Sequence, residues 1–157
     1  MQEPFEIVKT KLGATSVKNN LFGGEILHNP VGPWAEAKSL YVAHSQLAQR
    51  LLEADEGDDS IPLVIFDVGL GMATNALAAI DTQRELRAVG QRTRPLTIIS
   101  FENDLRMLNF ALENSASLDF LKPYADIVRS LLACGEYQSP DGSIYWRLRR
   151  GDFVQLI

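Results

Sequence analysis

A small set of glycines and carboxylates has the spacing expected of a nucleotide-like binding site. Asp67, Gly69 and Gly71 lie in the stretch IFDVGLGMATN, which changes from an apolar run into the start of a helical pattern. Glycines at such a turn let the backbone approach a ligand, and the first N–H groups of the following helix are free to donate hydrogen bonds. Glu102 ends the next apolar run and Asp152 follows a third. We expect Glu102 to bind the hydroxyls of a ribose and Asp152 to contact the edge of a base.

Two classes of ligand fit a glycine turn of this kind. A dinucleotide site prefers G-x-G-x-x-G, with an acidic residue about 20 residues further on. Here Thr74 stands at the third glycine position, and Glu102 follows Gly71 by 31 residues. S-adenosylmethionine has no pyrophosphate, and its cationic sulfonium and ammonium groups favour an acid such as Asp67 at the turn. The residues therefore favour the methyl donor, while a glycine turn that holds no ligand stays an open alternative.

Alternating strands and helices are expected to position these residues. Short apolar or alternating runs predict strands at 62–66, 96–101 and 144–148, and helical spacing predicts helices at 72–89, 104–114 and about 118–134. This order predicts an α/β fold with a parallel sheet and right-handed crossovers. The continuous apolar run at 62–66 also predicts a strand that is buried on both faces.

The remaining segments suggest an incomplete domain with an irregular N-terminal extension. Residues 1–33 are rich in turn-forming residues, 34–52 have helical spacing after Pro33, and 53–60 read as an exposed acidic loop. We therefore divide the chain into an N-terminal segment, 1–61, and a cofactor-binding half-domain, 62–157. Only half of a doubly wound sheet is readable before the chain ends, so we expect truncation, one uncovered sheet edge and apolar face, and self-association.

Composition sets limits on location and partners. The chain has 157 residues, of which 46% are hydrophobic, and a formal net charge of −5. It has no apolar run long enough to cross a membrane and no apolar signal-peptide core, and the single Cys134 excludes an internal disulfide. We therefore expect a cytoplasmic protein. The acidic charge argues against indiscriminate nucleic-acid binding but leaves room for a local basic face, for example at Arg147, Arg149 and Arg150.

The two histidines do not predict a metal site. His28 lies in a loop from which it could approach a cofactor, and His44 lies within the expected helix at 34–52. Their separation does not match the spacing of metal ligands. We expect no metal ion in this protein.

Several motifs taken together resemble one known family. IFDVGLGMATNALAAI resembles the glycine motif of the methyltransferase domain of bacterial tRNA 5-methylaminomethyl-2-thiouridine enzymes, the MnmC-like family. TIISFENDL resembles that family's second strand, DGSIYWRLRRGDFVQLI its third strand with the following G-D and helix, and GEILHNPVGPWAEAKSLYV its N-terminal segment. The match covers nearly the whole chain, in order and at suitable spacing.

The resemblance implies a Rossmann-like methyltransferase fold, S-adenosylmethionine as cofactor and tRNA as substrate. It assigns Gly69, Gly71 and Asn75 to the cofactor turn, Glu102 to the ribose and Asp152 to the adenine. Asp67 takes the place of an acid near the methionine part of the cofactor. Glu36 matches an acid that lies over the active site, and it is the residue expected to assist catalysis.

The chain also departs from the family pattern. Met72-Ala73 replaces Thr-Gly after the second glycine, the HNPVGPW loop is longer and less acidic, and the acceptor-side motif and the oxidase domain are absent from the sequence. We therefore keep open a methyltransferase of this fold acting on a small molecule or a protein, and a non-catalytic or dinucleotide-binding α/β domain.

Overall fold

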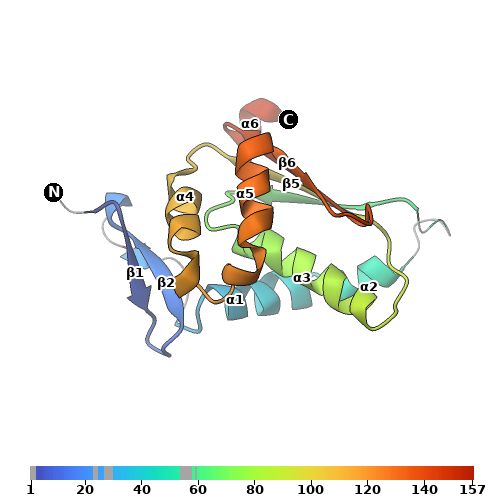
Figure 1. Cartoon of the computed structure of the whole chain (residues 1–157), viewed down its shortest axis with the longest axis horizontal. Helices are drawn as coiled ribbons and strands as arrows, with labels where there is room; N and C mark the ends of the chain where they lie inside the picture. The colour runs from blue at the N-terminus through green and yellow to red at the C-terminus, as the bar shows by residue number, and fades with distance from the viewer. Residues whose placement is uncertain (1–2, 23–24, 27–29, 54–57, 59) are drawn as a thin grey trace.

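The protein is described by a computed structural model that covers residues 3–22, 25–26, 30–53, 58 and 60–157 (Figure 1). Its larger sheet contains the strands β4 (Leu63–Val68), β5 (Leu96–Glu102), β6 (Glu136–Gln138) and β7 (Ile144–Arg150). Its main crossover helices are α3 (Thr74–Ala88), α4 (Arg106–Glu113) and α5 (Ala125–Cys134). Short helical segments complete this part of the chain: η3 (Ser115–Ser117), η4 (Lys122–Tyr124) and α6 (Phe153–Leu156).

The larger sheet has the strand order β4-β5-β7-β6. β4, β5 and β7 are parallel, and Asp67, Ser100 and Leu148 stand side by side in this register. β6 is an antiparallel addition to β7 that the sequence did not predict. The parallel strands and their crossover helices make a Rossmann-like α/β arrangement, which confirms the predicted fold class.

The two faces of the sheet differ sharply in burial. Leu63, Ile98 and Trp146 point to the face that holds the core, and Figure 1 shows α3 and the N-terminal helices on that side. On the other face of β4, Val64 and Phe66 are 46% and 61% exposed. The prediction that this strand is buried on both faces was wrong, because no described element covers its second face. Among the described strands, only β5 pairs with β4.

The sequence suggested that the N-terminal segment is irregular, and this was wrong. Its described residues form a three-stranded antiparallel sheet in the order β1-β2-β3, with the strands β1 (Phe5–Lys9), β2 (Thr15–Asn19) and β3 (Glu25–Ile26). The 3-10 turn η1 (Asn20–Phe22) follows β2. Gly13, with φ 85°, supports the turn between the first two strands. Phe5 and Val17 are buried, so the apolar residues of this sheet join the main core.

The helix expected at 34–52 is present but interrupted. It consists of α1 (Pro33–Glu36), the π-helical segment η2 (Ala37–Ala43) and α2 (Leu47–Leu52). Gln46 adopts a left-handed conformation, with φ 54°, and separates the last two. Leu47 and Leu51 enter the core, and these helices pack against α3.

Candidate functional site

The turn between β4 and α3 has the open backbone that a ligand requires. Gly69 and Gly71 have φ values of 80° and 54°, which glycine adopts without strain. A Cβ atom at Gly69 would meet nothing within 4 Å, and one at Gly71 would meet only the Met107 sulfur at 3.9 Å. The Gly69 amide donates to the Phe101 carbonyl at 3.0 Å, which fixes the turn against the end of β5. Open space therefore lies directly over the backbone of the turn.

Glu102 lies beside this turn, at the carboxyl end of β5. Its Oε2 accepts a hydrogen bond from the Gly71 amide at 3.1 Å. Its Oε1 accepts from the Asn103 and Asp104 amides at 2.9 and 3.0 Å. A carboxylate has room for about four hydrogen bonds, so this side chain keeps acceptor capacity toward the space above the turn. The expectation that Glu102 and the glycine turn share one crevice agrees with this geometry.

Asp67 is held by a chain of buried hydrogen bonds that runs across the sheet. It is 9% exposed, and its Oδ2 accepts from the Ser100 hydroxyl at 2.7 Å. Ser100 in turn accepts from the Trp146 indole N–H at 2.8 Å. Burial raises the pKa of Asp67 above its ordinary value, and the negative charge of Glu102 adds to the rise, while the bond from Ser100 opposes it. The carboxylate is therefore fixed in place by residues of all three parallel strands.

Three neighbouring hollows surround the glycine turn. The central hollow, of about 300 Å³, is lined by Gly69–Met72, Thr74, Asn75, Glu102, Met107 and Tyr41. A second hollow, of about 570 Å³, shares Gly71, Glu102 and Met107 with it and extends to Asp104 and Arg106. A third, of about 420 Å³, shares Gly69, Asn75 and Tyr41 with it and runs along β4 past Asp67. Because they share lining residues around the turn, we refer to these three hollows together as the glycine-turn groove.

Two further residues of this groove were given no role in the site by sequence reasoning. Thr74 begins α3 and is 3% exposed, and its Oγ1 has no hydrogen-bond partner among the residues that the structure describes. An unpaired hydroxyl at this depth is costly unless a ligand or a water molecule completes it. Tyr41 reaches the groove from η2, and only the packing of η2 against α3 brings it there. The position of Thr74 within the turn motif could have predicted that it lines the groove, whereas nothing in the sequence around Tyr41 could have done so.

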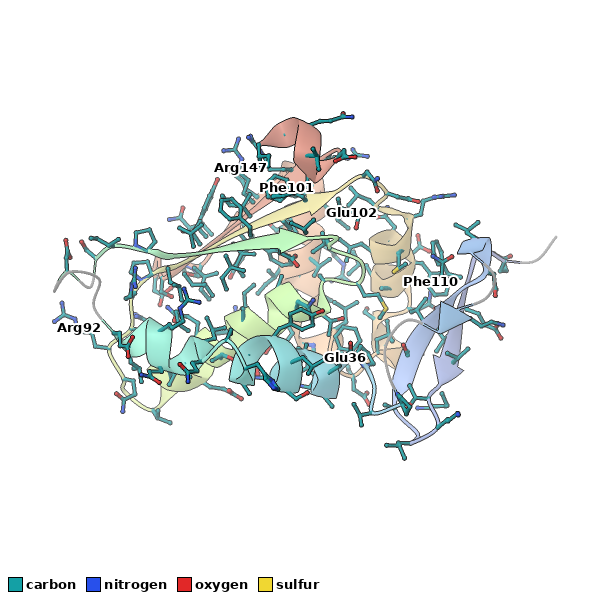
Figure 2. The ribbon with its side chains drawn as sticks, turned by 180° about the vertical axis from the view of Figure 1, so that it is seen from behind. Glu36, Arg92, Phe101, Glu102, Phe110 and Arg147 are labelled. Atoms are coloured by element: carbon teal, nitrogen blue, oxygen red, sulfur yellow. The ribbon has the colours of Figure 1, made fainter. Side chains whose placement is uncertain are left out.

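Asp152 and Glu36 do not line the glycine-turn groove. Asp152 caps α6, where its Oδ1 accepts from the Val154 amide at 2.8 Å. It still lies near the end of β5, since the Gly151 amide donates to the Glu102 carbonyl at 2.9 Å. Glu36 ends α1, and Figure 2 places it in the helical layer, away from Glu102 at the end of the sheet. The roles assigned to Asp152 and Glu36 therefore stay predictions.

His44 and Cys134 are not among the residues that line the groove, and His28 lies outside the described residues. His44 is exposed at the end of η2, where its Nδ1 lies 2.7 Å from the Ser39 carbonyl. Cys134 is exposed at the end of α5. His28 is among the residues that the structure does not describe. In the described part of the chain, no group of three or more metal-ligating side chains is assembled.

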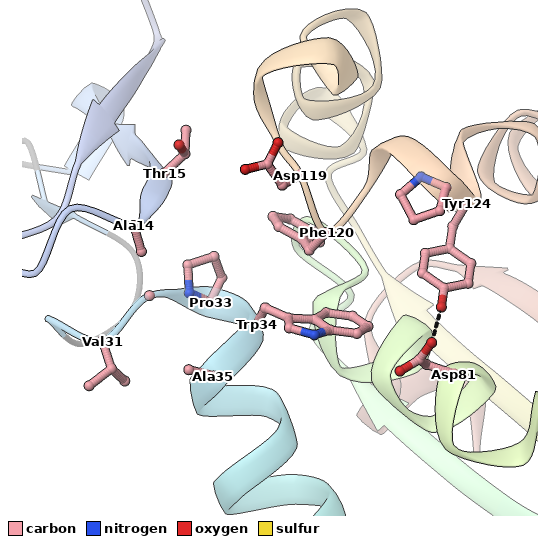
Figure 3. Close-up of a pocket in the computed structure, with 12 residues that line it drawn as sticks. Ala14, Thr15, Val31, Pro33, Trp34, Ala35, Asp81, Asp119, Phe120 and Tyr124 are labelled. Atoms are coloured by element: carbon pink, nitrogen blue, oxygen red, sulfur yellow. Dashed lines mark hydrogen bonds between the residues drawn. The ribbon is translucent and has the colours of Figure 1, made fainter. Parts of the chain in front are cut away.

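A separate hollow of about 530 Å³ lies between the N-terminal sheet, α1 and η4 (Figure 3). Trp34 stacks against Phe120 and Tyr124 at centroid distances of 6.1 and 6.2 Å. The Tyr124 hydroxyl donates to Asp81, and burial together with this bond raises the pKa of the hydroxyl. Asp81 also pairs with Lys38 at 2.5 Å, so these polar groups are already satisfied. None of the residues predicted for cofactor binding lines this hollow.

Comparisons with known proteins agree with the fold. No protein-family model and no curated protein matches the sequence. The solved structure of MnmC2 from Aquifex aeolicus matches 99% of this chain with a TM-score of 0.66 and 21% sequence identity. The chain spans 46% of the length of that structure's chain. At this level of identity the likeness establishes an MnmC-like fold.

Among the described helices, none is both long and apolar enough to span a membrane.

Proposed function

We propose that the glycine-turn groove binds S-adenosylmethionine and that this chain is the cofactor-binding part of a methyltransferase. One observation carries the proposal: the Gly71 amide and the Glu102 carboxylate are joined at the carboxyl ends of two neighbouring parallel strands. Ligands of open α/β sheets bind at this edge, where a carboxylate can receive hydroxyls and backbone amides can approach the ligand. The unpaired Thr74 hydroxyl in the same groove also supports a bound ligand.

Each residue of the groove has a proposed task. Glu102 would bind the ribose hydroxyls, because Oε2 faces the turn and keeps acceptor capacity. Gly69, Gly71 and Asn75 would hold the cofactor against the start of α3. Asp67, fixed through Ser100, would provide negative charge near the cationic methionine part. Asp152 would reach the adenine from the end of β7.

The bound cofactor would supply an electrophilic methyl group. This chain's own contribution would then be alignment and exclusion of water, since methyl transfer to a neutral amine needs no covalent nucleophile. Alignment of this kind can contribute roughly 7–11 kcal/mol in favourable cases. Glu36 is proposed to assist the acceptor amine, although its place on α1 requires the acceptor to approach from the helical layer.

For the substrate we propose the aminomethyl group of a modified wobble uridine in tRNA. The motifs IFDVGLGMATN, ISFE and RRGD support it through their resemblance to the MnmC-like family, and the fold agrees with that family. Arg149 and Arg150 also support it, because both are exposed at the carboxyl end of β7 beside the strand that carries Glu102. Basic residues there can contact phosphates despite the acidic net charge. A cytoplasmic location would suit this role and stays a prediction.

Calorimetry with S-adenosylmethionine, its demethylated product S-adenosylhomocysteine, and NAD tests the cofactor. We expect both sulfur-containing ligands to bind and NAD to give no heat of binding. Binding of NAD alone would instead support a dinucleotide domain. The substrate is tested with a longer chain that carries the acceptor side, by transfer of a labelled methyl group to bulk tRNA lacking the modification. Transfer to a small molecule or protein but not to tRNA would refute the substrate proposed here.

A further inference from the structure

The amino end of α3 has no side-chain cap among the described residues. The first hydrogen bond within this helix runs from the Leu77 amide to the Ala73 carbonyl, at 2.9 Å. The amides of residues 74–76 therefore precede the intrahelical bonds, as at the start of any α-helix. Ala73 is the N-cap and has no side chain that could accept from them, and the first turn contains no acidic residue. The partial positive charge of this helix end is thus available to an anion.

A second feature of the same helix end is the buried hydroxyl of Thr74. Thr74 is 3% exposed and lines the central hollow, and its Oγ1 has no hydrogen-bond partner in the described part of the chain. Thr82, further along α3, is 5% exposed, but its Oγ1 donates to the Ala78 carbonyl at 2.8 Å. Buried hydroxyls are normally paired in this way. Threonine in a helix has two accessible χ1 rotamers, so the Thr74 hydroxyl can turn toward a ligand in the hollow.

The charges around the hollow select the kind of anion. Glu102 lines the central hollow, and Asp67 lines the neighbouring hollow that shares Gly69 and Asn75 with it. The start of α3 therefore offers a positive site close to two carboxylates. A diphosphate would bring its own negative charges toward both carboxylates, and like charges at short range repel. An α-amino acid group has an ammonium that can face Asp67 and a carboxylate that can face the helix end, so this group fits the site.

On the basis of the cofactor proposed above, we propose that the start of α3 and the Thr74 hydroxyl bind the carboxylate of the methionine part of S-adenosylmethionine. The carboxylate accepts hydrogen bonds from this hydroxyl and from amides of the first turn, and the helix dipole stabilises its charge. In the free chain the hydroxyl stays buried without a partner, which lowers stability. The bound carboxylate supplies that partner, so Thr74 determines specificity for a ligand with this group.

Calorimetry with S-adenosylmethionine and its decarboxylated analogue tests this assignment, because the two ligands differ only in the carboxylate. Thr74→Val keeps the shape of the side chain and removes the hydroxyl. We expect it to lose roughly 10-fold in affinity for S-adenosylmethionine, as for one hydrogen bond to a charged group. Its affinity for the analogue should change by less than about twofold. Thr82→Val, the same substitution on the same helix, is the matched control and should change neither affinity.

The outcomes separate this assignment from the choice of cofactor. If the wild type binds both ligands and Thr74→Val loses affinity for both equally, or for neither, the role of Thr74 is overturned while the cofactor stands. If the wild type binds neither ligand, the cofactor proposal is refuted together with the role of Thr74.

Urea unfolding of the ligand-free chain gives a readout that does not depend on the cofactor. Thr74→Val removes a buried hydroxyl without a partner, so its urea midpoint should be higher than that of the wild type. Thr82→Val removes a paired hydroxyl, so its midpoint should be lower. A lower midpoint for Thr74→Val would show that its hydroxyl is paired in the free chain, and it would overturn the proposal.

Discussion

The Glu102→Gln substitution removes one negative charge from the glycine-turn groove and keeps the size of the side chain. In the wild type, Oε1 accepts two backbone N–H groups and Oε2 accepts the Gly71 amide. A glutamine amide has only one oxygen, so its NH₂ group must face at least one of these donors. An unpaired donor costs about 1–3 kcal/mol when buried, and this partly exposed site should lie near the lower limit.

The same substitution should weaken cofactor binding more than it weakens folding. A hydrogen bond to a charged group contributes about 1.5–3 kcal/mol, which corresponds to a roughly 10- to 150-fold loss of affinity for S-adenosylhomocysteine. Calorimetry measures this loss, and urea unfolding measures the accompanying destabilisation, expected to be about 1 kcal/mol. Glu113→Gln, the same chemical change at an exposed site on α4, is the control and should alter neither quantity. An affinity for Glu102→Gln within twofold of the wild type would refute the assignment of this residue.

Further predictions concern the residues around the turn. Gly69→Ala and Gly13→Ala should each lower stability by roughly 1 kcal/mol, because both glycines have positive φ with open space around them. Only Gly69→Ala should weaken the binding of S-adenosylhomocysteine, which calorimetry measures. Equal effects of the two substitutions on binding would contradict the proposed groove. Ser100→Ala should lower the free energy of unfolding by roughly 2–5 kcal/mol, since it leaves the buried Asp67 carboxylate and the Trp146 N–H unpaired. Urea titration measures this loss, and Ser130→Ala, on α5, is the control, with an expected change within about 0.5 kcal/mol. Burial raises the pKa of Asp67, so the folded state binds its proton more tightly than the unfolded state does. The contribution of Asp67 to the free energy of unfolding therefore falls as the pH rises from the ordinary pKa of 3.8 through the raised pKa of the folded state. Asp67→Asn should therefore gain stability relative to the wild type across that rise, and unfolding curves that keep a constant difference would show that Asp67 titrates normally.

The sequence was most informative where one segment determines its own structure. The apolar run before Gly69, the glycines and the helical spacing after Thr74 together predict β4, the turn and α3. The expectation that Glu102 lies beside the glycine turn depended on the assumption that the two strands are neighbours, because parallel strands end at one edge of a sheet. These features depend on local pattern and simple topology.

Features that depend on tertiary pairing were missed. β1 and β2 are short and contain lysines and a glutamate among their apolar residues, so they read as loop until their pairing is known. β6 has three residues and exists only through its pairing with β7. The Asp67–Ser100–Trp146 chain requires the register of three strands. The approach of Tyr41 to the groove likewise requires the packing of η2 on α3.

The most direct test of the glycine-turn groove is a titration of the ¹⁵N-labelled chain with S-adenosylhomocysteine, followed by nuclear magnetic resonance. We expect saturable shifts of the amide signals of Gly69, Gly71 and Asn75, with the signals around Trp34 and Tyr124 unchanged. Shifts confined to the hollow beside Trp34, or no saturable shift at the glycine turn at millimolar ligand, would contradict the proposed cofactor site.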